Sequence, residues 1–182
     1  MSKKNLIRIG FFVTLILLGF VGYVSMGGLS ESKLTVQENV EYLMYGKFFK
    51  GNAKTELGHV FKETDSIVSP FKEKGDVAGF FYSNPSKGNN YQVEVFVGIR
   101  LDEKLDVEIT GFEYRTFKFG KSIQGKQDAY FLFSTLYNDI FQFAESKEYV
   151  LDSIQAFERY PSENETIIEI PFKGEVSTSK YY

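Results

Sequence analysis

Two segments of the chain match each other, and this repeat constrains the fold more than any other sequence feature. In the first copy, Phe80–Pro85 is followed by the alternating run Val93–Ile99. In the second copy, Ala156–Pro161 is followed by Thr166–Phe172. Aligning the two prolines places the copies 76 residues apart, and a helix-like stretch precedes each copy. Such internal similarity indicates one supersecondary unit used twice, here a β-α-β-β unit.

The spacing of apolar residues predicts the elements of each unit. Alternation is typical of a half-buried strand, and recurrence at i, i+3, i+4 and i+7 is typical of an amphipathic helix. In the first unit we expect strands at 34–49, 77–82 and 92–101 and a helix at 54–68. In the second unit we expect strands at 105–119 (bulged near Gly111), 153–160 and 166–173, a loop at 120–126, and a helix from the N-cap Asp128 to Ala144.

Two such units in tandem predict an α+β fold on an antiparallel sheet. Both helices are expected on one face, which leaves the other face curved and partly open. A central cleft between pseudo-symmetric halves is then the expected ligand site. The domain would cover 34–173, with halves at 34–101 and 105–173 and a flexible polar tail at 174–182.

An uncharged and mostly apolar run at 9–26 precedes the domain. As a helix it would be roughly 27 Å long, close to the hydrocarbon thickness of a bilayer. We interpret the run as a transmembrane signal-anchor, because a cleaved signal peptide has a shorter apolar core. Cleavage is the alternative interpretation, with Ser25 and Gly27 as a poor cleavage site.

The charges around this run predict a single-pass topology. Lys3, Lys4 and Arg8 precede it, so the positive-inside rule places 1–8 in the cytoplasm and everything after the linker 27–33 outside it. All 24 acidic residues follow position 28, together with 18 of the 21 basic ones, which leaves this part with a formal charge of −6. That balance argues against nucleic-acid binding and against adhesion to an anionic membrane surface.

Composition excludes several kinds of chemistry. The chain has no Cys and one His, so it can form no disulfide, no Cys-based metal site and no multi-His metal site within one chain. We therefore expect no metal and no cofactor. His59 is read as a surface residue of the first helix, and Lys118, Lys121 and Lys126 as a solvated loop cluster.

Glu158 is the sharpest candidate for a binding residue. In a strand, Glu158 and Tyr160 share one face and Phe157 lies on the other, so they would face the cleft if Phe157 faces the helices. A carboxylate among aromatic rings would have a raised pKa or pair with a cationic ligand. Tyr82 lies 76 residues before Glu158 and is the candidate for an opposing wall. The alternative is a solvated strand Glu beside Arg159.

Three segments resemble elements of the GyrI-like family, the bacterial transcription-activator effector-binding domain. Gly79–Pro85 is similar to its Tyr-x-Asp-Pro element, with Asn84 where the family usually has Asp. Phe157–Pro161 is similar to its Glu-x-Tyr element, and Glu165–Lys173 looks like its last strand. The resemblance implies the duplicated fold, which SOUL-type haem-binding proteins also share.

The resemblance implies a function as well. Family members bind small, often apolar or cationic molecules in the central cleft, and Glu158 matches the family's ligand-contacting Glu. Because of the predicted anchor, we favour a membrane-anchored, non-enzymatic domain in which Glu158, Tyr160 and Tyr82 bind a small molecule. One alternative is a hydrolase of small electrophiles, with Glu158 as general base and Tyr160 or Tyr82 orienting it. The other is an adaptor for an unidentified protein partner.

Overall fold

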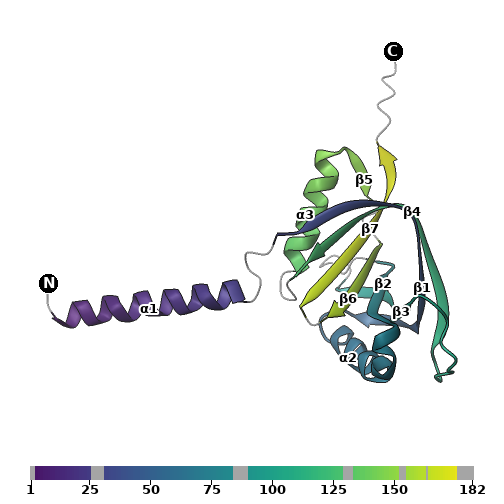
Figure 1. The fold of residues 1–182 in the computed structure, drawn as a ribbon, viewed down its shortest axis with the longest axis horizontal. Helices are drawn as coiled ribbons and strands as arrows, with labels where there is room; N and C mark the ends of the chain where they lie inside the picture. The colour runs from purple at the N-terminus through teal and green to yellow at the C-terminus, as the bar shows by residue number, and fades with distance from the viewer. Residues whose placement is uncertain are drawn as a thin grey trace, which may run out of the picture.

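The computed structural model describes residues 3–25, 31–83, 90–128, 133–151, 155–162 and 164–175. Asn84, Pro85, the beginning of the expected helix after Asp128 and most of the tail lie outside these ranges. Figure 1 shows an N-terminal helix, a curved sheet and two further helices. The elements are α1 (Lys3–Ser25), β1 (Lys33–Asn52), α2 (Leu57–Val68), the 3₁₀-helix η1 (Ser69–Lys74), β2 (Gly75–Phe81), β3 (Gln92–Leu101), β4 (Glu113–Gln127), α3 (Phe133–Ser146), β5 (Tyr149–Leu151), β6 (Ala156–Ser162) and β7 (Glu165–Glu175).

The duplicated unit is confirmed. The first unit runs β1-α2-β2-β3 and the second runs β4-α3-β6-β7, with η1 and the short β5 added. Every strand pairing is antiparallel, and the order in the sheet is β4-β1-β3-β2-β6-β7-β5. The two units meet at the centre, where β2 pairs with β6. The fold is therefore α+β, as the repeat predicts.

Both α2 and α3 cover one face of the sheet, which is also confirmed. Leu57, Val60 and Phe61 of α2 pack on this face beside Leu136 and Ile140 of α3. Burial of these apolar side chains holds the helices against the sheet. We call this layer the helix-side core; its buried members are Phe81, Val93, Val95, Val97, Ile123, Leu136, Ile140, Ala144, Ala156, Ile168, Ile170 and Phe172.

The opposite face of the sheet is closed and filled, so the expectation of a partly open face is wrong. An additional pairing between β4 and β7 joins the ends of the sheet into a ring of six strands. Aromatic side chains fill its interior: Tyr42 stacks on Phe157 with ring centroids 4.4 Å apart, and Phe80 stacks on Phe117 at 4.2 Å. We call this the inner aromatic core; it comprises Tyr42, Met44, Ala78, Phe80, Phe96, Phe117, Phe119 and Phe157.

The beginning of the second unit differs from the prediction. β4 runs from Glu113 to Gln127, whereas the sequence pattern predicted a strand at 105–119 and a loop at 120–126. The polar and glycine-rich composition of 120–127 suggested a loop, but these residues are held by neighbours on both sides, β1 and β7. The segment before β4 contains a turn instead, and Gly111 adopts a φ of +82° there, which favours glycine.

α1 is a helix of 23 residues that Figure 1 shows pointing away from the sheet. Its large apolar side chains between Phe11 and Val24 are 40–70% exposed. Among the described residues, no helix combines the length and the hydropathy required to cross a bilayer.

The backbones of β1 and β3 come unusually close where Gly46 pairs with Gly98. A Cβ atom on Gly98 would lie 2.2 Å from the carbonyl oxygen of Tyr45, and a Cβ atom on Gly46 would lie 2.2 Å from the carbonyl oxygen of Val97. The obstructing atoms belong to the backbone and cannot rotate away. Glycine at both positions therefore permits the tight pairing of these strands.

We expect Gly98→Ala to lower the free energy of unfolding by about 1–3 kcal/mol, because the added methyl group forces the paired strands apart. Chemical denaturation followed by circular dichroism measures this change. Gly58→Ala is the matched control, because a Cβ at Gly58 meets no described atom within 4 Å. A Gly98→Ala variant as stable as Gly58→Ala would contradict the close approach of the strands.

Candidate functional site

Glu158 lies in the middle of β6 and faces the two helices. Its neighbour Phe157 belongs to the inner aromatic core, so alternation turns Glu158 and Tyr160 to the helix side. The assumption that Phe157 faces the helices is therefore wrong. Glu158 remains a candidate binding residue, but it lies on the face of the sheet opposite to the one expected. It is only 8% exposed.

Two tyrosine hydroxyls occupy the carboxylate of Glu158. Tyr137, on α3, donates to Oε1 at 2.6 Å, and Tyr160, two residues along β6, donates a short hydrogen bond to Oε2. Hydroxyl bonds of this kind partly replace the water that a buried carboxylate loses. The structure thus brings Glu158 and Tyr160 together, as predicted, and adds Tyr137.

The surroundings shift the acid–base properties of this group. Burial raises the pKa of Glu158, and the hydroxyls of Tyr137 and Tyr160 oppose that rise only in part. Burial and the nearby Glu158 carboxyl raise the pKa of Tyr137 as well, so this tyrosine remains a hydroxyl donor. A titratable group held away from its ordinary pKa is frequent at functional sites.

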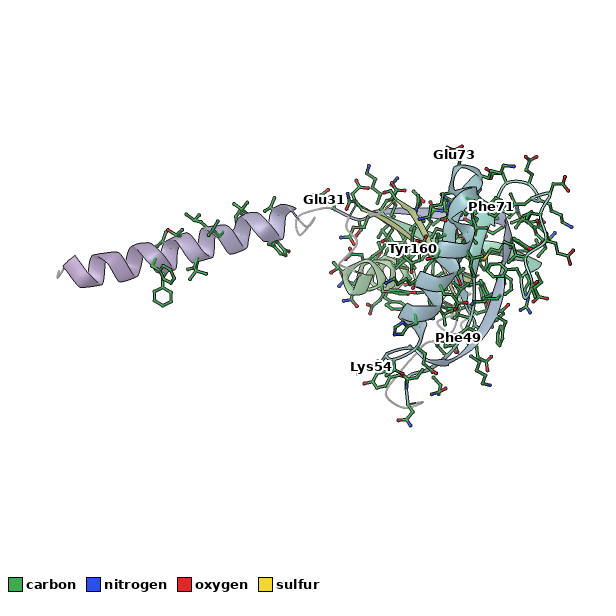
Figure 2. All side chains as sticks on the ribbon, turned by 90° about the horizontal axis from the view of Figure 1, so that it is seen from below. Glu31, Phe49, Lys54, Phe71, Glu73 and Tyr160 are labelled. Carbon is green, nitrogen blue, oxygen red and sulfur yellow. The ribbon has the colours of Figure 1, made fainter. Side chains whose placement is uncertain are left out.

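Aromatic rings from both helices surround the carboxyl group. Phe61 of α2 packs edge-on against Tyr160 at 5.8 Å between centroids and stacks on Phe81 at 6.4 Å. On α3, the ring of Phe141 lies 6.2 Å from that of Tyr137 and is 38% exposed. Figure 2 shows Tyr160 beside α2, whose Phe61 it contacts. The site is therefore a nearly buried carboxyl group flanked by aromatic side chains of α2 and α3.

A glycine on the neighbouring strand makes room for one of these rings. Gly79 pairs directly with Glu158, and a Cβ at Gly79 would lie 2.8 Å from Cζ of Phe61. A larger residue would displace the ring of Phe61. The absence of a side chain at Gly79 thus lets an α2 ring approach the sheet beside Glu158.

Tyr82 is not part of this group. It packs against Phe80 and Phe117 of the inner aromatic core, and its hydroxyl accepts a hydrogen bond of 3.1 Å from Arg115. Phe80 and Phe157 pair with each other across the centre of the sheet, and both face inward. They are therefore the equivalent residues of the two copies, and the offset between the copies at this point is 77 residues rather than 76. A slip of one residue turns a side chain to the other face of a sheet.

The sequence pattern did not predict the roles of Tyr137 and Phe61 beside Glu158. Tyr137 and Phe141 widen the apolar stripe of α3 at i, i+4 spacing, which is the sequence feature that could have indicated Tyr137.

A second buried carboxylate, Glu169, was not predicted either. Glu169 is fully buried on the inner side of β7, where it accepts hydrogen bonds from Tyr42 and, at 2.5 Å, from Ser122. Its place in an otherwise apolar strand is the feature that could have revealed it.

The remaining polar candidates lie away from the site. His59 is exposed on α2. Lys118, Lys121 and Lys126 lie on β4 rather than in a loop, and each pairs with a carboxylate, Lys126 with Glu165 at 2.7 Å. Within the described ranges, no group of three or more His, Asp or Glu side chains is arranged to hold a metal ion.

Comparison with known proteins identifies the fold. No family model and no curated protein sequence matches the chain. A hydrolase from Listeria innocua is similar in structure, with a TM-score of 0.56 and 14% identity, over 78% of this chain and 92% of that one. The EcmrR C-terminal domain has a TM-score of 0.54 and 13% identity, over 80% and 98%. The structure of SAV2435 bound to tetraphenylphosphonium has a TM-score of 0.51 and 13% identity, over 79% and 94%.

These similarities establish that the chain shares the fold of the EcmrR C-terminal domain and of SAV2435. Identities of 12–14% show a common fold and assign no activity.

The buried carboxyl group predicts a dependence of stability on pH. Because the folded-state pKa of Glu158 is raised above its ordinary value of about 4.5, the folded protein holds this proton more tightly than the unfolded chain does. The corresponding stability is present below pH 4.5 and is lost as pH rises through the folded pKa.

We therefore expect wild type to lose stability relative to Glu158→Gln as pH rises from 4.5, because glutamine does not titrate. Urea denaturation at a series of pH values measures the difference between the two free energies of unfolding. Glu94→Gln, which removes a carboxylate from an exposed ion pair, is the control for general charge effects. A difference that stays constant with pH would refute the raised pKa.

Proposed function

We propose that the domain binds a small-molecule cation with a largely apolar surface at Glu158, between the aromatic side chains of α2 and α3. The observation that carries this proposal is a nearly buried carboxyl group, Glu158, held by the hydroxyls of Tyr137 and Tyr160 beside the rings of Phe61 and Phe141. The rings would contact the apolar body of the ligand and attract its charge. Glu158 would supply the opposing charge.

Desolvation explains why a cation is favoured over a neutral ligand. A buried carboxylate without a positive partner is costly, and the raised pKa of Glu158 reflects that cost. A cation that reaches Glu158 would provide the missing partner and stabilise the ionised form. The shared fold with SAV2435, whose structure is bound to tetraphenylphosphonium, supports a ligand of this class.

A hydrolase of small electrophiles is the second candidate, since a structurally similar Listeria innocua protein is described as a hydrolase. Glu158 would then take a proton from water, with Tyr160 as an orienting residue. Binding is favoured because both oxygens of Glu158 already accept hydroxyl hydrogen bonds, an arrangement that stabilises charge.

We expect the purified full chain to bind tetraphenylphosphonium and to discriminate against tetraphenylborate, an ion of the same shape and opposite charge. Glu158→Gln should weaken binding of the cation about tenfold to hundredfold, because the Coulomb attraction of two opposite unit charges a few ångströms apart is worth on the order of 1–4 kcal/mol near a protein surface. Isothermal titration calorimetry, corrected by a detergent-micelle blank, measures both affinities.

Tyr82→Phe is the matched control, because Tyr82 lies on the opposite face of the sheet and its replacement should leave the affinity unchanged. Equal binding of tetraphenylphosphonium by wild type and Glu158→Gln would sink the assigned role of Glu158. Hydrolysis of small esters or epoxides by wild type but not by Glu158→Gln would favour the hydrolase.

We also propose that segment 9–26 anchors the domain in a membrane, with the N-terminus in the cytoplasm and the domain outside it. The exposed apolar side chains of α1 between Phe11 and Val24 support this proposal, because such a continuous surface is unfavourable in water. The three basic residues before the segment set the orientation.

The full chain should remain with membranes after alkaline carbonate extraction, and Leu17→Arg combined with Leu18→Arg should release it, because two charges oppose insertion. Val150→Arg is the control, since Val150 is an exposed apolar residue of the domain. A periplasmic-type reporter fused after Tyr182 should be active. Release of wild type by carbonate, or reporter activity confined to the cytoplasm, would disprove the anchor or its orientation.

A further inference from the structure

Helix α3 contacts two regions that are distant in the sequence. One is the candidate site, through the hydrogen bond from Tyr137 to Glu158. The other is the segment 31–34, which leads from α1 into β1. Ser32 donates a hydrogen bond of 2.6 Å to Oδ2 of Asp139, only two residues after Tyr137 on the same helix. A single short helix thus joins the site to the chain that leads to α1.

Packing reinforces this connection. Leu34 pairs with Gly125 of β4, and Gly125 is the point at which Leu136 and Ile140 of α3 rest on the sheet. A Cβ on Gly125 would lie 2.8–2.9 Å from the Cδ1 atoms of those two residues, so the helix sits close to the strand. Leu34 also packs against the helix-side core. A displacement of α3 would therefore disturb Leu34 as well as Ser32.

The contact between segment 31–34 and α3 is incomplete. An open pocket of about 550 Å³ lies between them, lined by Glu31, Ser32 and Leu34 on one side and by Asp139, Gln142 and Phe143 on the other. Close-packed interiors resist change, whereas an interface with open space can break and re-form at lower cost. The hydrogen bond from Ser32 to Asp139 is then the specific link between the two elements.

Ligand capture at Glu158 must change the α3 side of the site. Glu158 is nearly buried and its carboxyl group lies against the side chains of Tyr137 and Tyr160, so a bulky cation can reach it only by displacing at least one of these side chains. Tyr160 lies on the same strand as Glu158, whereas Tyr137 belongs to a helix that packs on the sheet through side chains. Tyr137 and α3 are therefore the more easily moved partner.

We propose that α3 couples ligand occupancy to the N-terminal segment: a cation at Glu158 displaces α3, breaks the contact between Ser32 and Asp139, and loosens residues 31–34. This inference rests on the proposed binding function and adds its regulation. Coupling is reciprocal, so loosening the Ser32 contact must also raise the affinity for the ligand by the same factor. Asp139 acts here as a positioning residue and contacts no ligand.

Hydrogen exchange on the full chain tests the coupling. In wild type, tetraphenylphosphonium should speed amide exchange in peptides that cover 31–36 about fivefold or more, the lower end of usual coupling factors. Ser32→Ala should show fast exchange without ligand, little further response to it, and a tighter affinity. Ser66→Ala is the control, since the hydroxyl of Ser66 donates to the carbonyl of Lys62 within α2, and the variant should behave like wild type.

Tyr137→Phe provides a test that needs no ligand. Removal of its hydroxyl releases α3 from Glu158 and should speed exchange at 31–36 in the free protein.

The outcomes separate the coupling from the binding function. If tetraphenylphosphonium binds to wild type with unchanged exchange at 31–36, Tyr137 moves without its helix and the coupling is overturned while the binding function stands. Failure of the cation to bind at all overturns both, and slow exchange in Tyr137→Phe overturns the coupling independently.

Discussion

Closure of the sheet by the pairing of β4 with β7 determines on which face the candidate site lies. Once the strands form a ring, the inner face is filled by stacked rings such as Tyr42 and Phe157 and its core side chains are nearly all buried. The other face is covered by the two helices α2 and α3. The candidate site therefore lies at the boundary between α2 and α3, and the duplicated sheet serves as its base.

The two halves share a scaffold but differ in their buried charge. Phe80 pairs with Phe96 in the first half, and its counterpart Phe157 pairs with Glu169 in the second. On the helix side, Phe81 occupies the position that corresponds to Glu158. At both of these positions the second half has a carboxylate where the first half has a phenylalanine, and the two carboxylates lie on opposite faces of the sheet. Each is surrounded by hydroxyl groups, so the second half carries the polar chemistry and the first supplies apolar walls.

The sequence predicted the repeat, the element types and the face shared by the helices, because these depend on local periodicity. It could not predict that 120–127 forms a strand, since that strand is stabilised by partners on both sides rather than by its own composition. It also misplaced Tyr82, because an alignment on prolines was one residue out of register at the sheet centre. Strand alternation and the resemblance to the Glu-x-Tyr element indicate Glu158 and Tyr160, whereas Tyr137 required the tertiary structure.

The hydroxyls of Tyr137 and Tyr160 solvate the Glu158 carboxyl group from within the protein. In the proposed binding, a ligand would have to displace these side chains as well as leave its own hydration shell. Small, strongly hydrated ions such as sodium or ammonium would exchange water for a carboxyl group that is already satisfied and gain little. A cation that spreads its charge over an apolar body loses less hydration and gains contact with the rings. Tyr137 and Tyr160 would then favour apolar cations over small hydrated cations of the same charge.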